Sequence, residues 1–257
     1  MKSRLLTIVL FYVASYGNLA MGFQQSSPAA FIENAGQLPS QNLIEFYFSQ
    51  QGNSVFFKKN GLSYVRKIVN SNGQVVSHRI EISFQGANKK VNIQPGALLA
   101  SHSNFYSHGM TDYVMARHYA SIIYKDLYPG IDLKYYLADD GALKYDFIIH
   151  SGGKVSDIRM EYSGLDESLN IDANGHLSIP TSIGSDVEKA PYTYQHDGTS
   201  IKSSYQLEGG VLSFNIGDYD LSKDLIIDPY IVWSTYHGGS NVDFGGALAQ
   251  DSIQNLY

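Results

Sequence analysis

The sequence predicts an all-β protein in which antiparallel hairpins form a sandwich or two packed sheets. The chain has 257 residues, including 20 Tyr and 24 Gly, and only 16% of its residues are charged. This composition favours strands that are joined by tight turns. Four turn sequences separate stretches in which apolar and polar residues alternate. No segment after residue 22 keeps a helical period, and the nearest, 109–119, is expected to form one or two helical turns or an irregular loop.

The clearest hairpin contains the sequence YYLADDGALKYDF at residues 135–147. A two-residue turn would mix its two faces, whereas a three-residue loop, 139–141, keeps one face apolar. Gly141 ends this loop and supplies the positive φ that it needs. The predicted pairs are Leu137–Leu143, Tyr135–Tyr145, Leu133–Phe147, Ile131–Ile149, Tyr136–Lys144 and Lys134–Asp146. Asp139 and Asp140 are therefore predicted to form a bend between two strands.

Three further segments fit hairpins with glycine-containing turns, at 71–73, 173–175 and Gly209-Gly210. In each, the chosen loop length keeps apolar residues opposite one another. The predicted pairs are Val69–Val75, Tyr64–Ile80, Leu62–Ile82, Ile171–Leu177, Leu169–Ile179, Leu207–Leu212 and Tyr205–Phe214. Further strands are expected at 44–49, 54–58, 121–124, 157–162 and 225–234, and a loop-like region at 95–110.

Residues 1–22 have the organisation of a cleaved secretory signal peptide. Lys2 and Arg4 precede an apolar stretch, 5–14, which is too short to span a bilayer stably. The sequence Ala20-Met21-Gly22 provides the small residues that a signal peptidase requires, so we expect cleavage after the last of them. The mature chain is therefore expected to be secreted or to lie on the outer cell surface, with no membrane span.

Charge and motif content argue against several classes of function. The net charge of −6, without a Lys/Arg cluster, gives no footprint for nucleic acid. Cysteine is absent, which excludes a disulfide framework and a thiol nucleophile. Asp243-Phe244-Gly245 spells the kinase magnesium tripeptide, but the glycine-rich loop and the catalytic H-R-D loop are missing. We therefore predict no enzyme activity, no catalytic residue and no cofactor.

Three histidines form the only candidate metal site suggested by the sequence. His102, His108 and His118 lie near Asp112, with spacings of six and ten residues. These spacings match none of the compact metal signatures, such as two histidines four residues apart on a helix. We therefore predict that no metal is bound, and that the histidines belong to surface loops.

A glycosidase-like pair of carboxylates would have to come from the acids in and around the loop at 139–141. This set comprises Asp132, Asp139, Asp140 and Glu161. Such chemistry requires two carboxyl groups at a defined separation across a substrate, and sequence spacing does not provide it. A cleft in which these acids converge would contradict the non-catalytic interpretation.

The end of the chain resembles the opening of the SBBP-type bacterial β-propeller repeat. The matching residues are Ser234-Thr235-Tyr236, Gly238-Gly239-Ser240, Asp243 and Asn255-x-Tyr257. The preceding part resembles the uncharacterised all-β domain found N-terminal to these repeats in secreted and surface proteins of Bacteroidota-like bacteria. The motifs that carry this resemblance are FIENAGQLP (31–39), LYPGIDLKYY (127–136), LKYDFIIHSGG (143–153) and LIIDPYIVWSTYHGGS (225–240).

The resemblance implies an N-terminal all-β domain at 23–228, followed by the incomplete start of a β-propeller repeat at 229–257. The chain is then expected to be a fragment of a larger protein or a truncated product. The resemblance implies no catalytic residues, because none are assigned to this domain.

The expected function is that of a non-catalytic, exported module of a surface or secreted propeller protein, serving scaffolding, adhesion or partner binding. The partner is expected to be a protein or a glycan at the cell surface, and the binding residues remain open. The alternative is a carbohydrate-binding or carbohydrate-processing accessory domain, which would expose at least two tyrosine rings side by side on one sheet face. Against it, Tyr64, Tyr135 and Tyr145 lie on stripes predicted to be buried. A third possibility is a pro-domain or chaperone-like segment, in which the strand at 225–234 pairs with the N-terminal domain.

Overall fold

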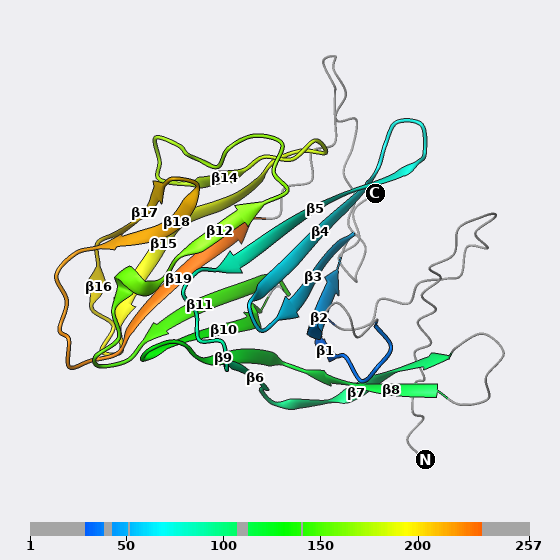
Figure 1. Cartoon of the computed structure of the whole chain (residues 1–257), viewed down its shortest axis with the longest axis horizontal. Coiled ribbons are helices and arrows are strands. Elements are labelled where there is room, and N and C mark those ends of the chain that lie inside the picture. Colours follow the sequence, from blue (N-terminus) through cyan, green and yellow to red (C-terminus); the bar gives the residue numbers. More distant parts are fainter. Residues whose placement is uncertain (1–28, 39–42, 51, 107–112, 140, 233–257) are drawn as a thin grey trace.

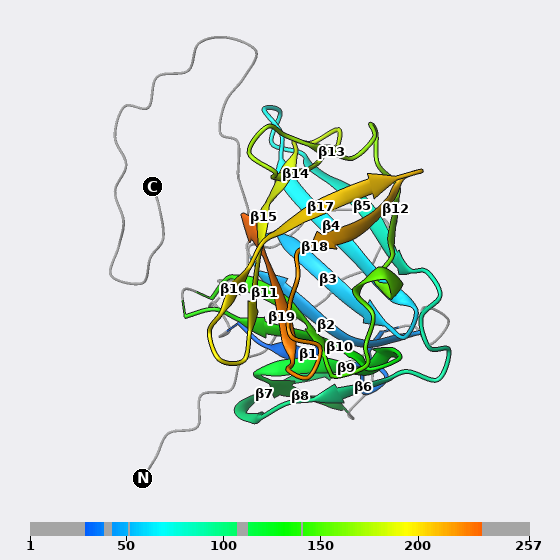
Figure 2. The ribbon, with the colours of Figure 1, turned by 90° about the vertical axis from the view of Figure 1, so that its left-hand side faces the viewer.

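The computed structural model describes residues 29–38, 43–50, 52–106, 113–139 and 141–232. These residues form two antiparallel sheets that pack face to face (Figures 1 and 2). The one helix in this part of the chain is a 3₁₀ turn, Val155–Asp157. None of the described helical structure could therefore cross a bilayer. The predicted all-β class is confirmed, and a sandwich fits the arrangement of the two sheets.

Sheet A has ten strands and sheet B has nine. In spatial order, sheet A consists of β17 (Ser203–Glu208), β18 (Val211–Ile216), β12 (Met160–Ser163), β5 (Val75–Phe84), β4 (Gly61–Val69), β3 (Asn53–Lys58), β2 (Ile44–Gln50), β1 (Phe31–Glu33), β8 (Tyr113–Tyr119) and β7 (Leu98–Tyr106). Sheet B consists of β13 (Asn170–Ile171), β14 (Leu177–Ile179), β15 (Asp186–Gln195), β19 (Leu225–Val232), β11 (Leu143–Ile149), β10 (Ile131–Leu137), β9 (Ser121–Tyr128) and β6 (Asn92–Pro95), with β16 (Ser200–Ile201) beside β15.

The predicted hairpin registers are confirmed with one exception. All six pairs proposed for β10 and β11 occur, and Gly141 in their loop has a φ of +81°. The pairs proposed for β4–β5 and β17–β18 also occur. In β13–β14 the ladder contains Ile171–Leu177 but ends at the next pair, so Leu169 is not paired with Ile179 in it.

Two regions were predicted wrongly. The loop expected at 95–110 contains β7, and the helical or irregular segment expected at 109–119 contains β8. Strand β7 carries many small and polar residues, and the buried positions of β8 include Ala116 and His118, so neither strand has a clear apolar stripe. The two strands pair with each other at the end of sheet A, and β8 also pairs with β1. At 157–162, the strand begins only at Met160, after the 3₁₀ turn. The predicted signal peptide, and residues 233–257 of the predicted propeller repeat, lie outside the described residues.

Strand β19 lies in the middle of sheet B and runs through Asp228 and Pro229 to Val232. It pairs with β11 on one side and with β15 on the other. The strand expected at 225–234 therefore pairs, over its described length, with strands of the same β domain.

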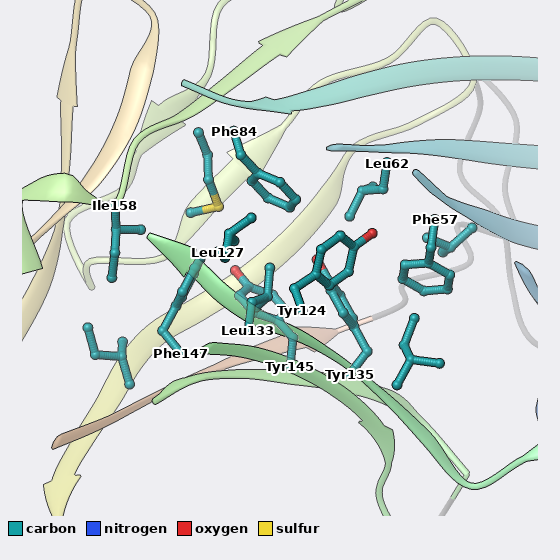
Figure 3. Close-up of a cluster of buried hydrophobic side chains, with 14 of the residues drawn as sticks. Phe57, Leu62, Phe84, Tyr124, Leu127, Leu133, Tyr135, Tyr145, Phe147 and Ile158 are labelled. Carbon is teal, nitrogen blue, oxygen red and sulfur yellow. The ribbon is translucent and has the colours of Figure 1, made fainter. Parts of the chain in front are cut away.

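The core lies between the inner faces of the two sheets and is rich in aromatic rings (Figure 3). Tyr64, Tyr135 and Tyr145 are all buried, as their stripes predict. The rings of Tyr135 and Tyr145 lie side by side with centroids 5.6 Å apart. The ring of Phe57 in sheet A packs against the ring of Tyr135 in sheet B, with centroids 4.9 Å apart. This contact joins the two layers. Each large side chain buried in this way stabilises the fold by about 1.5–3 kcal/mol.

Candidate functional site

The exterior of sheet B carries aromatic and charged side chains on four neighbouring strands. We call this set the outer tyrosine face. Its members are Lys134 and Tyr136 on β10, Lys144 and Asp146 on β11, Asp228 on β19, and Tyr192 and Tyr194 on β15. The four strands follow one another in the order β10, β11, β19, β15. Because adjacent strands lie about 4.8 Å apart, these side chains form one continuous surface.

A bulge brings the two tyrosines of β15 onto this surface. The register of β15 against β19 shifts between Lys189 and Tyr192, opposite the stretch of β19 that contains Pro229. Proline has no N–H to give to a ladder, so it is tolerated inside a sheet mainly at bulges. After the bulge Thr193 is fully buried, whereas Tyr192 is 53% exposed and Tyr194 lies on the same side.

Two acids face each other at the centre of the outer tyrosine face. The ladder between β11 and β19 ends at Phe147–Ile227, and Asp146 and Asp228 lie directly beyond these two residues. The two acids are close enough for their charges to interact, although like charges on neighbouring strands destabilise a sheet. Lys144 Nζ lies 2.7 Å from Asp228 Oδ2, and the Tyr136 hydroxyl donates a 3.1 Å hydrogen bond to Asp146 Oδ1. Burial, and then the charge of Asp228, raise the pKa of Asp146 from 3.8 to about 6. A carboxyl group perturbed by both burial and a specific neighbour is a common feature of functional sites.

The aromatic rings of this face are held beside the charges. The ring planes of Tyr192 and Tyr194 are inclined by only 28°, and their centroids lie 5.5 Å apart. Lys134 Nζ and Lys144 Nζ lie 5.1 and 5.9 Å from the centroid of the Tyr136 ring, within the range of cation–π attraction. The surface therefore presents the exposed ring of Tyr192 and the half-buried rings of Tyr136 and Tyr194 next to groups that form hydrogen bonds and ion pairs. Such a combination is suited to binding a polar ligand.

A second cluster of acids lies inside the sandwich. Glu188 on β15 is buried and accepts hydrogen bonds from the hydroxyls of Tyr145, at 2.9 Å, and Tyr205, at 3.1 Å. Nearby, Arg66 of sheet A donates to Asp186 of sheet B at 3.0 Å. Burial raises the pKa of Glu188 from 4.5 to about 7 and also raises the pKa of Asp186. Because Tyr205 and Arg66 belong to sheet A, both contacts join the two sheets.

A cavity of about 50 Å³ adjoins these interior acids. Its walls are mainly apolar and tyrosine side chains, and the buried Asp186 Oδ2 has no hydrogen-bond partner. A cavity of this size has room for a few water molecules, but not for a sugar or a cofactor. The outer tyrosine face is therefore the better candidate for ligand binding.

The predicted histidine group does not form a metal site in the described part of the chain. His118 is buried on β8, and its ring nitrogens lie 3.0 and 2.8 Å from two serine hydroxyls of β7. Burial lowers the pKa of His118. His102 is exposed on β7, while His108 and Asp112 lie outside the described residues. Among the described residues, no three His, Asp or Glu side chains come together as metal ligands would.

The predicted acids lie on separate parts of the fold. Asp132 on β10 is buried, and it accepts hydrogen bonds from a backbone N–H and from neighbouring basic side chains, including His150 at 3.0 Å. Glu161 belongs to β12 of the other sheet and is exposed. Asp139 is exposed at the tip of the β10–β11 hairpin, and Asp140 lies outside the described residues. The structure therefore does not bring the described members of this set together.

The residues that the structure does bring together carry no local sequence pattern. The Lys134–Asp146 register is confirmed, but the hydrogen bond to Asp146 comes from Tyr136. Its acidic neighbour, Asp228, lies on a strand that is remote in sequence, so the acid pair becomes visible only when the strand order is known. The sequence offered one relevant pattern, the two tyrosines at 192 and 194, whose alternation places them on one side of a strand.

Comparison with known proteins identifies one family. A family described as a domain of unknown function (DUF7948) matches residues 31–230, which span the fold from β1 into β19. Neither the curated proteins nor the solved structures contain a match to the chain.

Proposed function

The chain belongs to the family of the domain of unknown function DUF7948, and from its surface we propose that it is a non-catalytic binding module. In this proposal the module is part of an exported β-propeller protein that is secreted or displayed on the outer cell surface. The N-terminal sequence supports export, and the resemblance of residues 229–257 to a propeller repeat supports the larger context. The partner is a protein or a glycan at the cell surface, rather than a nucleic acid.

The observation that carries this proposal is the outer tyrosine face. Its two lysines and two acids balance in charge, and its rings and charged groups hold one another in place through short contacts. A surface that is already ordered before binding loses less conformational entropy when a partner arrives. The two neighbouring acids, Asp146 and Asp228, repel each other and weaken the sheet locally. A local cost in stability of this kind is expected where a surface serves a function.

A second candidate, carbohydrate binding, is favoured by one specific feature. Tyr192 and Tyr194 provide the pair of adjacent rings on one sheet face that a sugar platform requires, and Tyr192 is largely exposed. Exposed aromatic side chains combine a large apolar surface with a polar group. Asp146, Asp228 and Lys144 lie beside them and could hydrogen-bond to sugar hydroxyls. In this reading the glycan is the partner of the same face.

Binding to the outer tyrosine face is tested with a variant of that face and a control variant elsewhere on the surface. The purified chain, Tyr192→Ala and Val75→Ala are compared on a glycan array and on immobilised envelope proteins. Val75 is a suitable control because it is 68% exposed, against 53% for Tyr192, but lies on the β4–β5 hairpin of sheet A. We expect Tyr192→Ala to lose binding and Val75→Ala to retain it. Equal effects of the two variants, or no binding by the parent chain to either surface, would contradict the proposal.

Further results distinguish a glycan partner from a protein partner and test export separately. Binding on the glycan array that is competed by free sugar assigns the face to carbohydrate, whereas binding only to protease-sensitive envelope material assigns it to a protein. Export is tested independently by sequencing the N-terminus of the secreted protein, which is expected to begin at Phe23.

A further inference from the structure

The strand at the end of sheet A has an unusual edge. Natural proteins protect sheet edges with charged residues, with proline, or by keeping the strand short. At the other ends of the described sheets, β13 has two residues, β6 has four and includes Pro95, and β17 has six and ends at Glu208. Strand β7, in contrast, has nine residues, with the sequence LLASHSNFY, and contains neither proline nor an acidic, lysine or arginine residue.

Exposed apolar side chains gather on this strand and its neighbour. Four of the nine large exposed hydrophobic residues in the described part of the chain lie on β7 and β8: Leu98, Tyr106, Tyr113 and Met115, each between 46% and 63% exposed. The rings of Tyr106 and Tyr113 lie 5.5 Å apart. Figure 1 shows β7 and β8 along one margin of the molecule, where they extend past β1. Concentrated apolar exposure of this kind marks a protein interface.

We propose that the outer edge of β7, with which no other described strand pairs, joins β7 of a second copy of this chain in antiparallel orientation about a two-fold axis at His102. The sequence of the strand is complementary to itself in this arrangement. Leu98 would lie opposite Tyr106 of the other copy, and Leu99 opposite Phe105, so apolar residues meet at both ends. The polar residues of the middle meet each other, and no charged pair opposes the association. A two-fold contact of this type closes and gives a dimer.

The bulge in β7 is compatible with this pairing. The register against β8 shifts between Leu98 and His102, whereas His102 to Tyr106 pair with β8 without interruption. A bulge strengthens the local twist of a strand without ending it, and all nine residues remain extended. In the proposed dimer, the regular half of each β7, 102–106, would therefore pair with the more twisted half of the other copy's β7, 98–102.

The two-fold axis at His102 provides a test by charge complementation. His102 is exposed, and in this arrangement it faces its own copy across the axis, while Arg117 of β8 lies opposite it within the same copy. His102→Glu places two negative charges opposite each other, and His102→Lys places two positive charges there; both arrangements are unfavourable. An equimolar mixture of the two variants places opposite charges across the axis.

The mass in solution is measured by light scattering during size-exclusion chromatography across a dilution series. We expect the parent chain to have twice the mass of one chain, each His102 variant to have the mass of one chain, and the mixture to recover the doubled mass. Substitution of Val75 with Glu or Lys is the control, since Val75 is 68% exposed on the β4–β5 hairpin of the same sheet and its variants are expected to remain dimeric. Recovery in the mixture also shows that the variants are folded.

Three results would overturn this inference. A parent chain that is monomeric throughout the dilution series would leave the β7 edge to a different protein. Variants that remain dimeric would place the contact elsewhere on the molecule. A mixture that stays monomeric, although circular dichroism shows both variants folded, would exclude the two-fold axis at His102.

Discussion

Replacing Glu188 with Gln tests how the interior of the sandwich is held together. Glu188 is only 3% exposed, and it accepts hydrogen bonds from Tyr145 and Tyr205. Burial raises its pKa to about 7, because the charged form loses its hydration. A glutamine has nearly the same shape as the protonated acid and can accept the same two hydrogen bonds. The substitution therefore removes the titration while it preserves the packing.

The expected magnitude follows from the difference in pKa between the folded and unfolded chain. With values of about 7 and 4.5, the difference is 2.5 pH units, and each unit corresponds to about 1.4 kcal/mol. The folded state holds the proton more tightly, so Glu188 costs nothing below pH 4.5. As the pH rises from 4.5 through 7 the cost grows, and it levels off at about 3 kcal/mol above pH 7.

The measurement is the free energy of unfolding by urea, followed by circular dichroism, for the parent chain and Glu188→Gln at several pH values from 4 to 8.5. The two proteins should have similar stability at pH 4, and the variant should be more stable by up to about 3 kcal/mol at pH 8.5. Taking the difference cancels the titration of other acids. Glu208→Gln is the control, because Glu208 is exposed and its substitution should give a difference close to zero. A difference for Glu188→Gln that does not change with pH would refute the reasoning.

Three other predictions concern different parts of the fold. Arg66→Met leaves the buried Asp186 without its ion pair, and the free energy of unfolding in urea should fall by about 3–5 kcal/mol. Gly61→Ala places a Cβ 2.1 Å from the carbonyl oxygen of Ile82, so we expect a loss of at least about 2 kcal/mol in the same assay. Asp146→Asn removes a carboxyl group whose pKa is raised to about 6; its charged form costs stability above that pH, so the variant should melt at a higher temperature than the parent at pH 8 but not at pH 4.

The hairpins could be predicted from the sequence because their registers depend on neighbouring residues. In each case an apolar stripe allowed one loop length, and a glycine stood where the backbone turns to positive φ. Gly73, Gly141 and Gly175 have φ values of +75°, +81° and +79°, and Gly209 and Gly210 both have positive φ. Turn chemistry and side-chain alternation agree at these positions, so local information is sufficient.

The remaining strands could not be predicted because they depend on contacts between distant segments. Strand β7 has serine, histidine and asparagine where an apolar stripe would have been expected, and it becomes a strand by pairing with β8. The position of β19 between β11 and β15 has no counterpart in the sequence. Asp146 and Asp228 are 82 residues apart (228 − 146), and only that strand order makes them neighbours. The candidate site was invisible for the same reason.

Strand β19 links the outer tyrosine face to the stability of the core. Its residues Leu225 and Ile227 are fully buried, while Asp228 belongs to the opposite side and completes the acid pair. Because side chains alternate along a strand, a slip of one residue would move Asp228 inward and expose the two apolar side chains. The same register therefore specifies both the core and the surface, and a substitution in β19 cannot distinguish loss of binding from loss of folding. Tyr192 on β15 avoids this difficulty, since its exposed ring can be removed without opening the core.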